Sequence, residues 1–129
     1  MEKTTQLSVT MENQPGQLAR LCRALAHAKV NVRGISICDA SDVSTIRVVT
    51  SDPEAAKRAL REAGLAFIAQ EVLVLELKDE PGALERVAVR LGDCKINIQY
   101  LYGTGDTGKG KGIIVVRTDD ADAARQCLA

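Results

Sequence analysis

The chain has 129 residues, with 17 basic and 17 acidic side chains and a formal net charge of zero. This balance argues against nucleic acid or an anionic membrane as the main partner, and three aromatic residues are too few for a surface that stacks bases. No apolar run approaches the roughly 18 residues of a membrane span, and the first residues lack a secretory apolar segment, so we expect a cytoplasmic protein.

One sequence unit occurs twice in this chain. Residues 13–18 return 66 positions later as residues 79–84, and flanking leucines, arginines and asparagines repeat at the same offset. From Thr50 onward the offset is 68, so that Thr50 matches Thr118. Repetition at a fixed period indicates a repeated structural unit. We therefore predict two domains, residues 1–70 and residues 71–129.

The first copy begins with a strand pattern and continues with a helix pattern. Leu7, Val9 and Met11 alternate with polar residues, as in a half-buried strand. After a Pro-Gly turn, apolar residues at helical spacing predict a helix over 17–28. Two strands should follow, over 32–38 and 44–50.

A second helix is predicted over 53–63 because Asp52 is a preferred cap and Pro53 suits the first helical position. The second copy predicts helices over 83–93 and 120–128. Residues 66–77 must provide both the last strand of copy one and the first strand of copy two, which one long strand could achieve. The fold class is α+β, with two ferredoxin-like βαββαβ units in tandem and helices on one face of antiparallel sheets.

The second copy stops after its second helix, so its fourth strand is missing from this sequence. An open sheet edge invites pairing. Either the chain continues beyond the given residues or a partner covers this edge.

The four cysteines, Cys22, Cys38, Cys94 and Cys127, are far apart and lack the paired spacing of a zinc or redox motif. Cys22 and Cys127 fall on the inward faces of predicted helices. In a cytoplasmic protein, buried free thiols are favoured over disulfides. We predict no metal and no cofactor.

Two further features resemble parts of a phosphate-binding site or a catalytic site, but the sequence around each lacks the other parts that such a site requires. Residues 103–110 match most of a phosphate-binding Walker A loop, but Gly110 stands where serine or threonine is required and a strand pattern follows instead of a helix. We interpret them as a mobile hairpin loop. His27, the only histidine, lies near a helix end and has no serine or cysteine neighbour in sequence. Without a nucleophile–base pair, the chain is not expected to be an enzyme.

The two Pro-Gly turns are better candidates for binding. The proline presets the first helical turn, and Gly16 or Gly82 lets another molecule approach the backbone closely. The next N–H groups are unpaired donors at the positive helix end, which suits a carboxylate. The alternative is structural, since Asn13 and Asp79 could simply bond to their own turns.

These motifs resemble those of the ACT domain family, small regulatory modules that bind amino acids. The family pattern is a polar residue, one more residue and Pro-Gly-x-Leu, followed after the helix by a Gly- or Val-Asn-Ile element. Residues 13–18 with 30–32, and residues 79–84 with 96–98, match it. The resemblance covers nearly the whole chain twice, and is nearest to small stand-alone tandem ACT proteins.

The resemblance implies a ligand held between two ACT units packed side by side, by the Pro-Gly loop of one and the strand-two asparagine of the other. Carried over, the candidate site residues are Met11, Asn13, Gly16, Gln17, Leu18 and Asn31 in copy one, and Asp79, Gly82, Ala83, Leu84 and Asn97 in copy two. Asp79 stands where asparagine is common, and would attract an ammonium and repel a carboxylate. We therefore expect two unequal sites.

The function that follows is an amino-acid-binding regulatory protein that forms a homodimer. The alternative is a regulatory subunit that docks on a metabolic enzyme and needs no ligand of its own. A polar-rimmed pocket would favour the first function, and an exposed apolar patch would favour the second.

Overall fold

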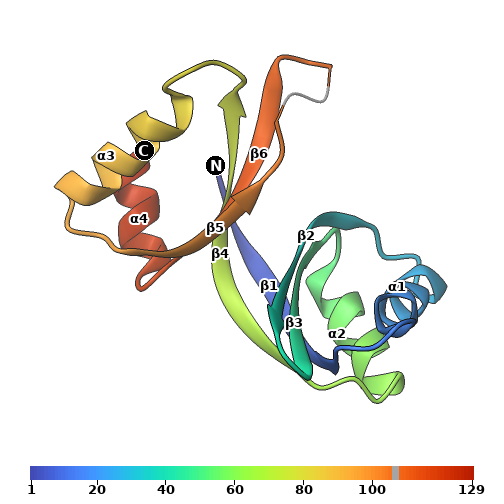
Figure 1. The fold of residues 1–129 in the computed structure, drawn as a ribbon. Helices are drawn as coiled ribbons and strands as arrows, with labels where there is room; N and C mark the ends of the chain where they lie inside the picture. The colour runs from blue at the N-terminus through green and yellow to red at the C-terminus, as the bar shows by residue number, and fades with distance from the viewer. Residues whose placement is uncertain (106–107) are drawn as a thin grey trace. The chain divides into compact units, whose positions relative to one another are not determined.

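The computed structural model describes residues 1–105 and 108–129, except for the side chain of Ala40. Helices and strands follow the predicted order, which confirms the tandem ferredoxin-like fold (Figure 1). The helices are α1 (Gln17–His27), α2 (Pro53–Glu62), α3 (Ala83–Asp93) and α4 (Ala121–Leu128). The strands are β1 (Glu2–Glu12), β2 (Val32–Ala40), β3 (Val43–Thr50), β4 (Phe67–Lys78), β5 (Ile98–Gly103) and β6 (Lys111–Thr118).

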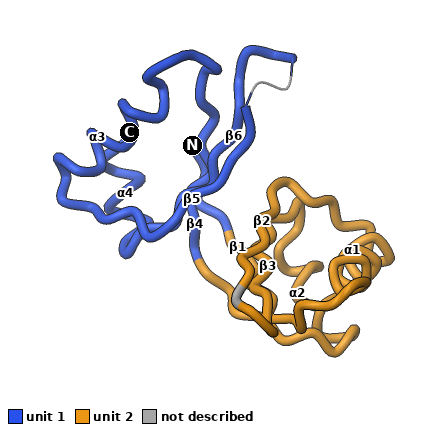
Figure 2. The backbone as a smooth tube through the Cα atoms, viewed as in Figure 1, with its two compact units in different colours: residues 1–4, 71–129 blue, residues 5–70 orange. Residues whose placement is uncertain are grey.

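The chain divides into two compact units (Figure 2). One unit consists of Thr5–Gln70, and the other of Met1–Thr4 together with Glu71–Ala129. We call them the 5–70 unit and the 71–129 unit. Among the residues that the structure describes, no helix is both long enough and apolar enough to cross a membrane.

Strands β1 and β4 run through both units. The strand order β2-β3-β1-β4-β6-β5 gives the 5–70 unit the arrangement β2-β3-β1-β4, and the 71–129 unit the arrangement β1-β4-β6-β5. The pairs of β3 with β1 and β2, and of β6 with β4 and β5, are antiparallel. As predicted, one long strand, β4, connects the two repeats.

The first residues of β1 take the place of the strand that the second repeat lacks. In the 71–129 unit they lie beside β4, on the side away from β6. Lys3 Nζ lies 2.8 Å from Asp122 Oδ1 on α4 and 3.8 Å from Glu71 Oε1. The hydrogen bond between Lys3 and Asp122 raises the pKa of the lysine and lowers the pKa of the carboxyl group. The sheet edge is therefore covered by this same chain.

In the 5–70 unit, the core lies between the sheet and its two helices. The register pairs Leu7 with Val48 and Val9 with Ile46, so these side chains share one face of the sheet. Leu21 and Leu60, on α1 and α2, pack against that face. Apolar residues that alternate along the strands and recur at helical spacing along the helices thus form one buried layer between the sheet and the helices.

The helices begin at two kinds of boundary. Before α2 and α4, the carboxylates of Asp52 and Asp120 accept hydrogen bonds from the N–H groups of Ala55 and Ala123. Before α1 and α3 stands a glycine in the left-handed region, and no side chain caps the helix. At a boundary of the second kind, no side chain bonds to the first backbone N–H groups of the helix, so these groups remain available to a ligand.

The prediction of free thiols was wrong for two cysteines. Cys94, just after α3, and Cys127, on α4, form a disulfide with their Cα atoms 6.4 Å apart. They are 33 residues apart in sequence, so only the packing of α3 beside α4 brings them together. Cys22 is exposed and Cys38 is half-buried, and both are free. The inward position expected for Cys22 was therefore also wrong.

We predict that Cys127→Ala lowers the melting temperature by about 10 °C, because the disulfide restricts the unfolded chain. Alanine is compatible with this position, since Ala59 occupies it in the first repeat. Scanning calorimetry without reductant measures the change, with Cys22→Ala, at an exposed free cysteine, as the matched control. Equal melting temperatures for wild type and Cys127→Ala would contradict a stabilising disulfide.

Candidate functional site

The two Pro-Gly loops connect β1 to α1 and β4 to α3. Gly16 and Gly82 have φ angles of 90° and 88°, a conformation that favours glycine. The N–H of Asn13 donates to the carbonyl of Asp42 at 2.8 Å, and the N–H of Asp79 donates to the carbonyl of Gly110 at 2.9 Å. Each loop is thereby fixed to the strand hairpin of its own unit.

Each loop also presents backbone donors at a helix start. Within the part of the chain that the structure describes, the N–H groups of Gly16, Leu18 and Ala19 have no hydrogen-bond partner. The N–H of Gln17 lies 3.4 Å from the carbonyl of Gln14, a long contact. The same is true of the second loop, where the unpaired groups belong to Gly82, Leu84 and Glu85. Such donors, at the positive end of a helix dipole, can bind a carboxylate.

The two loops differ in the side chain at their first position. Asn13 Nδ2 donates to Asp39 Oδ1 at 3.1 Å and to the carbonyl of Ser41 at 3.0 Å. The asparagine amide is therefore used within its own unit. The carboxylate of Asp79 has no such bond to any residue in 1–105 or 108–129, and remains available to a ligand.

A cavity of about 190 Å³ adjoins the second Pro-Gly loop. Asp79, Ala83 and Leu84, three of the predicted site residues, border it. The other residues around it come from the end of β4, from the loop itself, from the residue after β5 and from β6, and are Leu77, Lys78, Glu80, Thr104, Gly112 and Ile114. Charged groups of both signs and an apolar wall together suit a small zwitterion.

Thr104, Lys78 and Glu80 were not predicted as site residues. Glu80 carries its own ion pair, 2.6 Å from an arginine on α3. Thr104 belongs to the stretch that resembles a Walker A loop, and this stretch connects β5 to β6, the place where a hairpin loop was predicted. Its residues Asp106 and Thr107 lie outside the described residues. The internal repeat could have pointed to Thr104 as a site residue. In each repeat, the hairpin between the second and third strands is hydrogen-bonded to the Pro-Gly loop, and Thr104 belongs to the hairpin beside Asp79.

The strand-two asparagines lie far from the loop of their own unit. Asn31 follows α1, whereas Gly16 precedes it, and the 11 residues of that helix span about 16 Å. The backbone of Asn31 exchanges hydrogen bonds with Ser51 at 2.9 and 3.0 Å. Asn97 has the equivalent position after α3 and is exposed. A site that combines a loop with an asparagine therefore requires a second unit.

Met11 and His27 do not border the cavity at the second Pro-Gly loop. Met11, a predicted site residue, is buried in the core of the 5–70 unit. His27 borders a separate cavity of about 270 Å³ between α1 and α2, together with Glu62 and four alanines. Among the residues that the structure describes, no three histidine, cysteine or acidic side chains could hold a metal ion.

The sequence matches the family model described as an ACT domain pair over residues 2–129. The chain belongs to this family. The resemblance that the Pro-Gly and asparagine motifs predicted is thus confirmed, and the ACT domain pair spans both units described above.

Solved structures share the fold of this ACT domain pair. Protein BT0572 from Bacteroides thetaiotaomicron is 27% identical, with a TM-score of 0.91 over 98% of this chain and 86% of that chain. The ligand-free regulatory subunit of aspartate kinase from Thermus thermophilus is 16% identical, with a TM-score of 0.66 over 99% and 95% of the two chains. The corresponding subunit from Thermus flavus is 18% identical, with a TM-score of 0.61 over 99% and 91%. Among curated proteins, no relative matches the sequence.

We predict that Gly16→Ala lowers the free energy of unfolding by about 1–2 kcal/mol, the cost of a left-handed conformation for a residue with a β-carbon. A β-carbon at Gly16 would meet no atom within 4 Å, so only backbone strain is tested. Gly92→Ala is the control, because Gly92 lies in α3 with open space around it and alanine favours helices by about 0.5–1 kcal/mol. Urea denaturation measures both, and a neutral Gly16→Ala would contradict the strained loop.

Proposed function

We propose that this ACT domain pair is an amino-acid-binding regulatory protein without catalytic activity of its own. The observation that carries the proposal is the second Pro-Gly loop, where Asp79 and Leu84, with its unpaired N–H, border one cavity, and Gly82, with a second unpaired N–H, lies between them in the loop. An amino acid has the complementary groups, a carboxylate and an ammonium close together. The proposal places the protein in the cytoplasm.

In the proposed complex, the ligand carboxylate accepts hydrogen bonds from the N–H groups of Gly82 and Leu84, at the positive end of α3. Its ammonium meets the carboxylate of Asp79, a charge-assisted hydrogen bond. The ligand side chain packs against Leu77 and Ile114, which form the apolar wall. Asn97 or Asn31, from a unit alongside, completes the polar contacts.

The first loop is proposed as a weaker site. The N–H groups of Gly16 and Leu18 are equivalent to the donors of Gly82 and Leu84 and can bind a carboxylate in the same way, whereas the N–H of Gln17 contacts the carbonyl of Gln14. However, Asn13 supplies no negative charge for the ammonium, and its amide already bonds to Asp39 and to Ser41. We therefore expect the second loop to fill at lower ligand concentration.

Regulation would follow from linkage. A ligand held between two units stabilises the arrangement in which both units contact it. The shift cannot exceed the difference between the ligand's affinities for the two arrangements. An enzyme that contacts one arrangement would then respond to the amino acid concentration.

We predict that at least one of the twenty common amino acids raises the melting temperature, because a ligand of the folded state stabilises it by mass action. With that ligand, Asp79→Asn should weaken binding about tenfold or more by removing the charge opposite the ammonium. Asp119→Asn, an exposed carboxylate outside this cavity, serves as the control. Isothermal titration calorimetry measures both, and equal affinity for wild type and Asp79→Asn would exclude this loop as the site.

The edge strands support the proposal of a homodimer. In the 5–70 unit, β2 is the outer strand, and Ile35 and Ile37 on it are 41% and 51% exposed. In the 71–129 unit, Leu101 on the outer strand β5 is 37% exposed. Apolar side chains along an unpaired sheet edge favour association with another strand.

We predict that Ile37→Lys converts the homodimer to a monomer, because a charge on the edge strand opposes association. Light scattering at tens of micromolar protein measures the mass. Val89→Lys is the matched control, since Val89 is 54% exposed but lies on helix α3 and not on a sheet edge. A wild-type monomer mass that is independent of concentration would argue against the homodimer.

A regulatory subunit that docks on a metabolic enzyme is the second candidate function. The same exposed apolar edge favours it, because such a surface could bind an enzyme as well as a second copy. The shared fold with aspartate kinase regulatory subunits agrees with such a role. If no amino acid changes the melting temperature, this candidate becomes the better one.

A further inference from the structure

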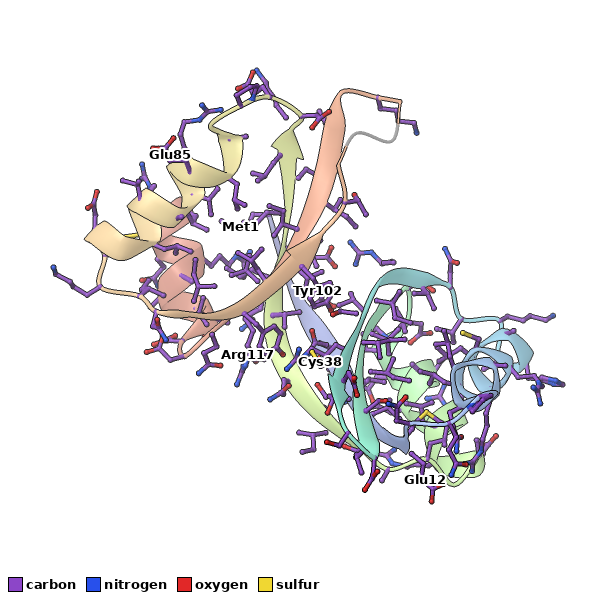
Figure 3. The ribbon with its side chains drawn as sticks, in the orientation of Figure 1. Met1, Glu12, Cys38, Glu85, Tyr102 and Arg117 are labelled. Atoms are coloured by element: carbon purple, nitrogen blue, oxygen red, sulfur yellow. A yellow bond between two sulfur atoms is a disulfide. The ribbon has the colours of Figure 1, made fainter. Side chains whose placement is uncertain are left out.

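We propose that the 71–129 unit contains a second ligand site, beneath α3, which binds a small apolar monocarboxylate. A cavity of about 290 Å³ lies between α3, β4 and the end of α4. Its apolar wall consists of Leu75, Leu77, Val87 and Leu128. Met1 borders it and lies beside α3 (Figure 3). Leu77 also borders the Pro-Gly cavity, but the remaining apolar residues do not.

The equivalent positions of the first repeat are buried in its core. These positions are Val9, Met11, Leu21 and Leu60, which are 0%, 5%, 0% and 0% exposed. In the second repeat, Leu77, Val87 and Leu128 are only half-buried. The same positions thus form a packed core in the first repeat and line an open cavity in the second.

One difference in the sequence contributes to the open cavity. Val87 is smaller than its counterpart Leu21 and fills less of the space beneath the helix. An apolar cavity of this size can hold a ligand of about ten non-hydrogen atoms.

The rim of the cavity carries an arginine without a carboxylate partner. Arg90 stands where the first repeat has Ala24. Its Nε donates to the carbonyl of Cys127 at 2.6 Å, and it forms no ion pair in the described parts of the chain. The remaining N–H groups of this guanidinium can bind a carboxylate.

The other charged side chains on the rim already have partners. Arg86 forms an ion pair with Glu80 at 2.6 Å, and Glu76 lies 3.9 Å from Lys111. Among the side chains around this cavity, Arg90 therefore supplies the positive charge available to a ligand. A cation above an apolar floor selects an apolar monocarboxylate over a neutral or cationic molecule of the same length.

The Cys94–Cys127 disulfide holds the wall of this cavity in place. Cys127 precedes Leu128, which lines the cavity, and its carbonyl accepts the hydrogen bond from Arg90. In the first repeat, the equivalent positions are Ala28 and Ala59, so no such link exists there. The disulfide thereby ties the end of α4 to the end of α3.

Calorimetric titration of the oxidised chain with sodium octanoate tests the proposal. We expect saturable binding, which Arg90→Gln weakens about tenfold or more by removing the charge opposite the carboxylate. Arg125→Gln, at an exposed arginine of α4 that does not border the cavity, should leave the affinity unchanged. Octan-1-ol, which has the same chain but no charge, should bind about tenfold more weakly or worse.

A second variant tests the cavity itself. Val87→Phe fills the apolar space and should abolish saturable octanoate binding while the melting curve remains cooperative. If this variant does not fold, Val87→Leu, which restores the residue of the first repeat, replaces it and should weaken binding several-fold. Cys127→Ala should also weaken binding, because the end of α4 loses its covalent link to α3.

The outcomes distinguish this site from the Pro-Gly site. Asp79→Asn should leave the octanoate affinity unchanged, so failure of one proposal does not decide the other. Equal affinity for octanoate and octan-1-ol would overturn the role of Arg90. Wild-type octanoate affinity in a folded variant with residue 87 enlarged would overturn the cavity as the binding site.

Discussion

The pairing of strands β1 and β4 is the constraint on which the other elements depend. Each strand serves both repeats. In the 5–70 unit, β1 is central and β4 is the outer strand, whereas in the 71–129 unit β4 is central and β1 is outermost. Units of this size approach the lower limit for an independent core. Sharing two strands gives the second repeat the fourth strand that residues 71–129 do not provide, and removes one open edge.

The two repeats keep one backbone and differ in the side chains at its functional positions. Both Pro-Gly loops hold glycine in the left-handed region, and both leave helix donors unpaired. However, Asn13 is bonded within its own unit, whereas Asp79 is available at a cavity. The two loops therefore share a backbone conformation and differ in their first side chain. The amide of Asn13 is bonded to the neighbouring hairpin, as in a structural loop, whereas the carboxylate of Asp79 is available to a ligand.

The second repeat also differs around the ends of its helices. Where the first repeat has alanines, at Ala28 and Ala59, the second has the linked pair Cys94 and Cys127. A covalent link between α3 and α4 restricts the unfolded chain, and this stabilisation offsets part of the cost of a less completely filled interior. The features that we interpret as ligand sites accordingly gather in the 71–129 unit.

The sequence alone determined the features that depend on neighbours in the chain. The repeat, the helix starts at Asp52 and at the Pro-Gly turns, and the strand alternation of Leu7, Val9 and Met11 all follow from local geometry. The family resemblance rests on the same local motifs. Only the tertiary structure decided that residues 1–4 complete the 71–129 unit, that Cys94 meets Cys127, and which residues border each cavity. Such contacts join residues distant in sequence, and they depend on which strand edges pair and which helices pack together, which no local pattern specifies.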